Sequence, residues 1–349
     1  MDYRSFVLAT SAAGHLVVLA AVVFSGGAAV AQTDTVEGEM FVSARTPWGT
    51  PDLQGLWSTG YIEIPLERPD EYGDREFLTD DEVSAEQERL SGQQDHSTGG
   101  TRPSAPRPGG DIGTYNTVFS GRGREVIRTR RNSQIIDPID GKIPWKPGVR
   151  EEVAAEISIA AGVRGRFRQE GTDGPEDRPN DRCRGVVLPH RFGTWESGGG
   201  HHRIVQSPGT VSIYYEYGPH GGAYRTIPLD GRPHISPRIR QWLGDARGYW
   251  EGETLVVDTT NFTDKTSYEG AGENLHLIER FTRVGPDFLK YHVTIEDATA
   301  FMRPWTIEIP LTKKDDRENQ IFESACHEGN YAMTGILAGA RAEEQEHAK

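Results

Sequence analysis

The sequence has little of what marks a metalloprotein or a nucleotide-dependent enzyme. Among its 349 residues there are only two cysteines, Cys183 and Cys326. No Cys-x-x-Cys or Cys/His spacing is present, so a structural zinc site is not expected. No Gly-x-Gly-x-x-Gly follows a strand and no P-loop occurs, which disfavours nucleotide-cofactor folds. We predict no cofactor, and metal binding stays open because several His and acidic residues could meet in space.

Positive charge is also scarce. The chain has 38 Lys and Arg residues against 52 Asp and Glu residues, a formal net charge of −14. Such a chain repels phosphate backbones, so we expect no nucleic-acid partner. The oligomeric state is left unknown by this balance.

Long apolar runs are absent after the N-terminus. Residues 1–31 have a short polar start, an apolar run from Phe6 to Val30 and an Ala-x-Ala ending at Ala31. This layout predicts a signal peptide that is cleaved before Gln32. A membrane anchor is the alternative, but Gly26-Gly27 interrupts the run. We therefore expect a periplasmic or secreted protein with no membrane span after cleavage.

The two cysteines fit this compartment. In an exported protein they most simply form one disulfide, which here closes a long loop. A pair of buried free thiols is the alternative.

Residues 32–110 have the composition of an irregular N-terminal arm and linker. Gly and Pro are too dense at 97–110 for a packed element. One surface helix is expected at 78–90, where Thr79 and Glu82 form a capping box.

Residues 111–349 have the pattern of a β-barrel domain. A helix is expected at 150–169. From residue 203, short alternating runs follow one another with breaks such as Asp230-Gly231 and Gly285-Pro286. Closely spaced strands of this kind indicate an antiparallel meander that closes into a barrel. The predicted fold is mainly β: a lipocalin-like antiparallel barrel with one or two peripheral helices.

Alternation assigns the faces of the later strands. The residues expected to point inward are Leu289, Tyr291, Val293, Ile295, Trp305, Ile307, Ile309 and Leu311. Asp297 continues the first series, which places a carboxylate at the inner rim.

The stretch 275–283 is more ambiguous. Its more apolar face carries Glu279, and its other face carries His276 and Arg280. If the apolar face points inward, Glu279 is buried. A buried carboxylate either pairs with an inward Arg or has a raised pKa, which would suit it to acid/base chemistry.

These patterns yield two sets of candidate site residues. Acid/base candidates are Glu279 and Asp297, with assistance at the rim from His276, Glu216 or His327. Candidate ligand-binding residues are Tyr215, Tyr217, Tyr291, Trp305 and Arg280.

A string of motifs carries a family resemblance. The order "TPDLQGLWS", "PLDGRPH", "WLGDARGYWEGETLVVDTTNFTDKT", "LHLIERFTRV", "TIEDATAFMRPW" and "ACHEGNY" resembles a group of exported hypothetical proteins from soil bacteria. The resemblance implies export and a lipocalin-like β-rich body, and it supplies no catalytic residues. Gly55-Leu56-Trp57 also resembles the first lipocalin strand, whose Trp closes the barrel base.

Two functions compete at this point. The first is an exported enzyme, a lyase, isomerase or hydrolase, that uses general acid/base chemistry on a small apolar or aromatic molecule. The second is a ligand-binding or carrier protein in which the same residues only bind the ligand. The enzyme is the preferred hypothesis, because ionisable residues recur in strands that a passive carrier could fill with apolar ones.

Overall fold

The structure is a computed structural model, and the parts it describes belong to the unit Met40–Lys349. The described residues are 41–58, 64–94, 126–154, 183, 188–189, 201–216, 222–264, 268–317, 321, 325–328 and 331–348. The predicted signal peptide, Tyr217 and residues 155–169 of the predicted helix lie outside them. No helix in these ranges is long and apolar enough to cross a membrane.

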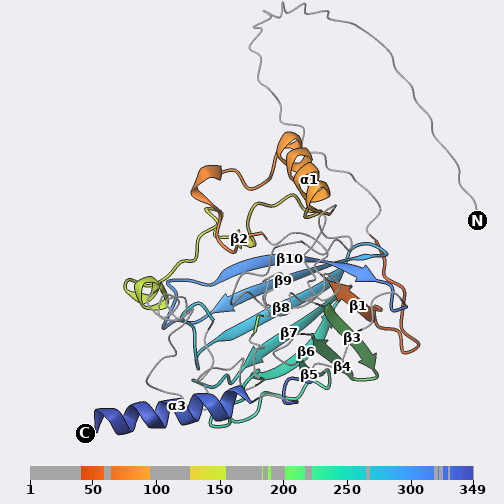
Figure 1. The fold of residues 1–349 in the computed structure, drawn as a ribbon. Coiled ribbons are helices and arrows are strands. Elements are labelled where there is room, and N and C mark those ends of the chain that lie inside the picture. Colours follow the sequence, from red (N-terminus) through yellow and green to blue (C-terminus); the bar gives the residue numbers. More distant parts are fainter. Residues whose placement is uncertain are drawn as a thin grey trace, which may run out of the picture. The chain divides into compact units, whose positions relative to one another are not determined.

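A ten-stranded antiparallel sheet dominates the described chain (Figure 1). Nine strands are paired in the order β5-β4-β3-β1-β10-β9-β8-β7-β6, and β2 pairs with β10. The strands are β1 (Gly55–Ser58), β2 (Ile135–Asp137), β3 (His201–Ser207), β4 (Thr210–Tyr215), β5 (Ala223–Pro228), β6 (Asp245–Glu251), β7 (Thr254–Thr260), β8 (His276–Arg283), β9 (Phe288–Glu296) and β10 (Trp305–Lys314). The predicted mainly β, antiparallel fold is confirmed.

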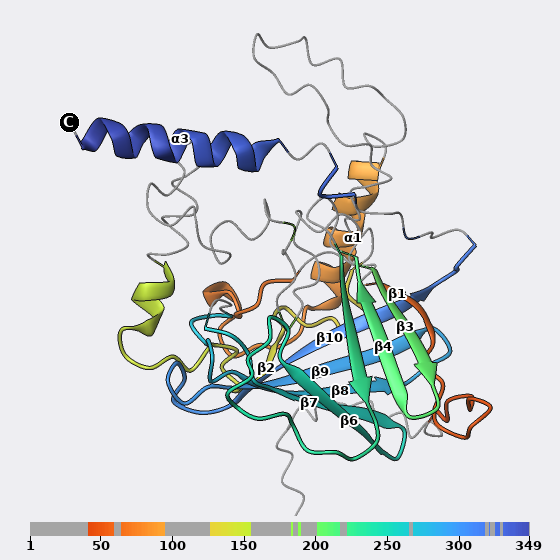
Figure 2. The ribbon, with the colours of Figure 1, turned by 90° about the horizontal axis from the view of Figure 1, so that it is seen from below.

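The two end strands of the sheet, β5 and β6, meet side by side. No backbone ladder joins them in the described residues, but the side chains of Ile227 in β5 and of Leu229, just after β5, lie close to the backbone of Gly248 in β6. A Cβ added at Gly248 of β6 would lie 2.7 Å from Cγ2 of Ile227 in β5 and 2.6 Å from Cδ2 of Leu229. In Figure 2, β3 and β4 cross in front of β8 and β9, so the sheet curves around one interior. The barrel is therefore nearly closed, with a seam between β5 and β6.

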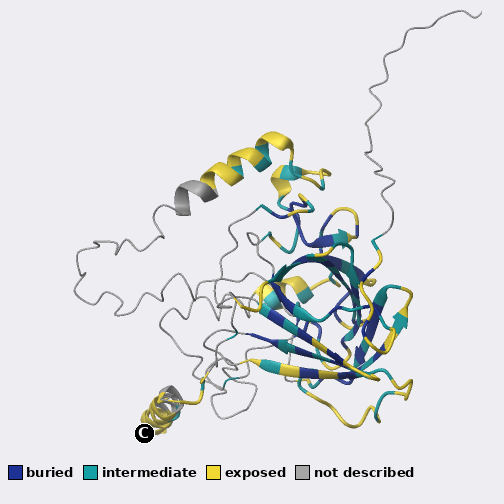
Figure 3. Ribbon diagram, turned by 90° about the vertical axis from the view of Figure 1, so that its right-hand side faces the viewer, coloured by how far each residue is buried: buried dark blue, intermediate teal, exposed yellow. Residues whose placement is uncertain are grey.

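Alternating burial shows which residues fill this interior (Figure 3). Along β9, buried and half-buried residues alternate without a break. All eight residues predicted to point inward from β9 and β10 are buried. Glu308, on the opposite face of β10, is buried as well, and its carboxylate lies 2.6 Å from Nε2 of His292 and 3.8 Å from Nζ of Lys290 in β9.

Strand β1, although it lies in the predicted irregular arm, is paired between β3 and β10. It carries Trp57, which is fully buried and donates from Nε1 to the carbonyl of Leu53 at 2.8 Å. Arg283 and Lys313 place their cationic groups 5.9 and 5.7 Å from the Trp57 ring centroid. Cation–π attraction therefore adds to the burial of this Trp in the barrel.

Two α-helices and one short 3-10 helix, η1 (Asp70–Tyr72), are described in full. In α1 (Asp80–Gln94), the predicted capping box is confirmed, since the Thr79 amide donates to Glu82 and the Glu82 amide donates to Thr79 Oγ1. The C-terminal helix α3 (Ala332–His347) is not predicted from the sequence. Of the predicted helix at 150–169, the described part is helical.

The two cysteines are joined. Cys183 and Cys326 form a disulfide, with Cα atoms 5.8 Å apart and a sequence separation of 143. The predicted pairing is confirmed, and the alternative of free thiols is wrong.

Candidate functional site

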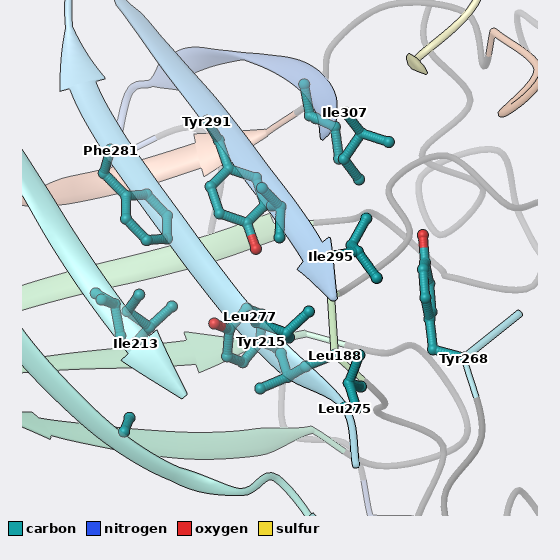
Figure 4. Close-up of a cluster of buried hydrophobic side chains, with 14 of the residues drawn as sticks. Leu188, Ile213, Tyr215, Tyr268, Leu275, Leu277, Phe281, Tyr291, Ile295 and Ile307 are labelled. Atoms are coloured by element: carbon teal, nitrogen blue, oxygen red, sulfur yellow. The ribbon is translucent and has the colours of Figure 1, made fainter. Parts of the chain in front are cut away.

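A group of polar side chains lies inside the apolar barrel. We call it the lumen cluster: Tyr215 (β4), Arg225 (β5), Thr259 (β7), Glu279 (β8) and Tyr291 (β9). Each residue is in phase with buried apolar neighbours on its own strand, so the period of two carries it inward. Figure 4 shows Tyr215 and Tyr291 entering the same interior from different strands.

Arg225 and Glu279 form the centre of the lumen cluster. Arg225 Nη1 donates to Glu279 Oε1 at 2.8 Å, and Nη2 donates to Glu279 Oε2. Tyr291 donates its hydroxyl to Oε1 at 2.7 Å, and Thr259 donates to Oε2 at 3.3 Å. Tyr215 OH accepts from Arg225 Nη1 at 3.3 Å. Both oxygens of Glu279 are therefore engaged twice.

Burying the two charged groups of this cluster is unfavourable unless each of them is paired and hydrogen-bonded. The side chain of Arg225 is 3% exposed and that of Glu279 is 0% exposed. Burial opposes the charge of Arg225, but the attraction of Glu279 raises the pKa of the guanidinium above its usual value. Burial also raises the pKa of Tyr215 to about 12 and that of Tyr291 well above its usual value. The tyrosines are neutral at pH 7, and the ion pair carries the only charges in the cluster.

Of the two alternatives for Glu279, the structure has the inward Arg. The residue faces inward as predicted, but the unpaired state that would suit it to acid/base work is not the one observed, because Arg225 holds both oxygens. Its catalytic role stays a prediction.

Three inward-facing N–H groups have no acceptor among the described residues. They are Nε of Arg225 and the indole Nε1 of Trp250 and of Trp305. Trp305 is fully buried and stacks on Tyr268 with ring centroids 6.2 Å apart. A buried donor without an acceptor is unfavourable by about 1–3 kcal/mol. The barrel interior therefore contains buried N–H donors that no acceptor among the described residues satisfies.

A second polar group lies on the outer wall. We call it the outer-wall chain: Asp245, His234, Asp258, His276 and Glu296, in bonding order. His276 Nε2 and His234 Nε2 lie 3.0 and 3.1 Å from Oδ1 of Asp258. Their Nδ1 atoms lie 3.0 Å from Glu296 and 2.8 Å from Asp245, respectively. Each ring lies between two carboxylates, so an imidazolium satisfies both of its neighbours.

Electrostatics agree with this geometry. The hydrogen bond from His276 lowers the pKa of Asp258, and the same bond to Asp258 raises the pKa of His276. Within the described part of the chain, however, no group of three or more His, Cys, Asp or Glu side chains is placed to hold a metal ion.

The remaining predicted site residues are dispersed. Asp297 is buried at the end of β9 as expected, where it accepts from the amides of Gly272 and Thr299 and so fixes a turn. Glu216 lies 2.9 Å from His201 Nδ1. None of these contacts joins the lumen cluster.

Two further candidates lie on the surface. Arg280 pairs with Glu251 on the outer wall, so this predicted ligand-binding residue does not face the interior. The physical reason is alternation, because its neighbour Glu279 takes the inward position. His327 is exposed beside the disulfide.

The sequence predictions did not name Arg225, Thr259 or His234. Arg225 is two residues before the buried Ile227 in "AYRTIPLD", so the same alternation that gave Glu279 predicts that it points inward. His234 lies in the β5–β6 connection, where no periodicity applies. Only folding brings its hydrogen-bond partners, Asp245 and Asp258, next to it.

No family model and no curated protein matches the chain. The wild-type fluorescent protein UnaG is 13% identical over 33% of this chain and 72% of its own, with a TM-score of 0.20. Secretory abundant heat soluble protein 4 from Ramazzottius varieornatus is 12% identical over 33% of this chain and 69% of its own, with a TM-score of 0.22.

Strand order and burial define the barrel. The β-rich body implied by the family resemblance is confirmed by the sheet, and the membership itself stays a prediction.

Proposed function

We propose that the protein binds a small, largely apolar molecule inside its barrel. The observation that carries this proposal is the lumen cluster, a buried polar group within an apolar interior. Ligand sites of this kind are mostly apolar, with a few placed polar groups that orient the ligand.

Stability alone is a poor reason for such a cluster. Replacing a buried ion pair by apolar residues of similar volume is often neutral or stabilising by about 1–4 kcal/mol. A purely structural barrel would therefore gain from an apolar interior at Arg225 and Glu279. Ligand orientation gives these residues a role that an apolar pair could not fill.

The carrier hypothesis is better supported than the enzyme hypothesis. Glu279 is engaged by Arg225, Tyr291 and Thr259, and the other acid/base candidates do not contact it. We also propose export, in line with the N-terminal signal pattern and with a disulfide, which persists in oxidising compartments.

The test is titration of the purified protein with N-phenyl-1-naphthylamine, a neutral aromatic amine whose fluorescence rises in apolar surroundings. We expect saturable binding of one probe per chain, with a Kd of about micromolar order. Val293 faces the interior and Thr294 the outer wall of the same strand. Val293→Trp should weaken binding about tenfold by filling the interior, and Thr294→Trp should not.

Thermal unfolding of each variant shows that it is folded before binding is compared. The absence of saturable binding to the folded wild-type protein, or equal effects of the two substitutions, would overturn the proposal.

A further inference from the structure

We infer that the barrel interior selects neutral ligands that carry a hydrogen-bond acceptor oxygen, such as ketones, esters or amides, over carboxylates. This inference rests on the proposed function and names its ligand class. It is carried by the state of each polar group in the lumen cluster.

The charges of the lumen cluster cancel within one ion pair. The Arg225 guanidinium is the only cationic member of the lumen cluster, and both of its terminal nitrogens donate to Glu279. The pair is neutral as a whole. A carboxylate ligand near Arg225 would also lie near Glu279, and like charges placed close together in a desolvated site repel each other strongly.

The carboxylate oxygens of the lumen cluster already accept hydrogen bonds from the protein. Glu279 Oε1 accepts from Arg225 and Tyr291, and Oε2 accepts from Arg225 and Thr259. Because both oxygens are already engaged twice, the cluster does not need a donor from the ligand. A ligand that brings hydroxyl or ammonium groups gains nothing here.

Some buried N–H donors of the interior have no acceptor among the described residues. Arg225 Nε is buried and has no acceptor in the described chain, and the same holds for the indole N–H of Trp250 and of Trp305. Of these, Arg225 Nε belongs to the cluster itself. A carbonyl oxygen would satisfy this donor without adding charge, and hydrogen bonds from charged donors are stronger than those between neutral groups. A neutral oxygen acceptor therefore fits both the charge and the free donor.

Two probes with the same aromatic body separate the classes. One is 6-propionyl-2-(dimethylamino)naphthalene, a neutral ketone, and the other is 6-(dimethylamino)-2-naphthoate, a carboxylate. The wild-type protein should bind the ketone at least about tenfold more tightly than the carboxylate at neutral pH. Equal affinities, or a preference for the carboxylate, would overturn the inference.

Glu279→Gln provides a reversal test, because the amide leaves the charge of Arg225 uncompensated. The preference should shift toward the carboxylate by about tenfold or more. Glu296→Gln, a matched change on the outer wall, should leave it unchanged. An unchanged preference in a folded Glu279→Gln protein would contradict the inference. If this variant does not fold, the wild-type ratio still decides.

Failure of the inference and failure of the proposed function are distinguishable. N-phenyl-1-naphthylamine has no carbonyl and reports binding alone. If it binds while the ketone shows no advantage over the carboxylate, the ligand class is wrong and the binding function stands. If N-phenyl-1-naphthylamine does not bind the folded wild-type protein, the binding function itself is wrong.

Discussion

His276 illustrates how a single residue acquires its properties. Its strand position places it on the outer wall, as predicted, and its ring lies between Asp258 and Glu296. The bond to Asp258 is the main cause of its raised pKa. A proton on His276 therefore stabilises the folded state.

This yields a prediction on pH dependence. The pKa of His276 is raised in the folded state above its ordinary value of 6.5. Its contribution to the free energy of unfolding is therefore full below pH 6.5 and is lost as the pH rises through the folded-state pKa. His276→Gln should remove this contribution, by less than about 1 kcal/mol for a partly exposed pair. Urea unfolding of both proteins from about pH 5.5 to 8.5 measures it.

His347→Gln, on the exposed end of α3, serves as the control for the loss of one imidazole. A wild-type advantage over His276→Gln that grows with rising pH would contradict the assignment.

Single residues were predicted unevenly from the sequence. The inward position of Glu279 followed from alternation, but its partner did not, because Arg225 lies 54 residues earlier and in another strand. Alternation also placed Arg280 outside, which removes it from the ligand-binding set. Asp258 and His234 belong to a strand and a loop whose contact no local pattern encodes.

At the scale of elements, the contact between β5 and β6 cannot be read from the strand order, in which they are the two end strands. The two strands meet through Ile227, Leu229 and Gly248 rather than through a ladder. Arg225 of β5 also reaches Thr259 of β7 and Glu279 of β8. Side chains thus close the barrel where backbone hydrogen bonds do not.

Gly248→Ala tests this closure. The added methyl group would lie 2.6 Å from Leu229 Cδ2 and 2.7 Å from Ile227 Cγ2, closer than a van der Waals contact. We expect a loss of about 1–3 kcal/mol in the free energy of unfolding, measured by urea denaturation. The double variant Gly248→Ala/Leu229→Ala should recover part of it.

The matched control is Gly339→Ala in α3, where the added group would meet no heavy atom within 4 Å apart from its chain neighbours and the helix's own nearby backbone. This change should be neutral or stabilising by up to about 1 kcal/mol. Equal stability of Gly248→Ala and the wild type would show that the seam is not closed by this contact.

At the scale of the whole molecule, the disulfide links two residues that are far apart in the sequence. It joins Cys183 to Cys326 across 143 residues. In the chain-entropy account, such a link lowers the entropy of the unfolded state more when the loop is longer.

Reduction should therefore destabilise the protein by about 2–5 kcal/mol. Urea unfolding with and without a phosphine reductant measures this difference. The double variant Cys183→Ser/Cys326→Ser should unfold at the lower midpoint in both conditions. Two reactive thiols in the native, unreduced protein would exclude the disulfide.

The sequence by itself determined the strands, the face that most of their residues present and the capping box of α1. These features depend on residues within a few positions of one another, so their period is visible in the chain. Only the tertiary structure decided that β1 lies between β3 and β10 and that Arg225 meets Glu279. Strands β5 and β8 are not neighbours in the sheet. Their side chains meet because the sheet curves closed, and curvature is a property of all its strands together.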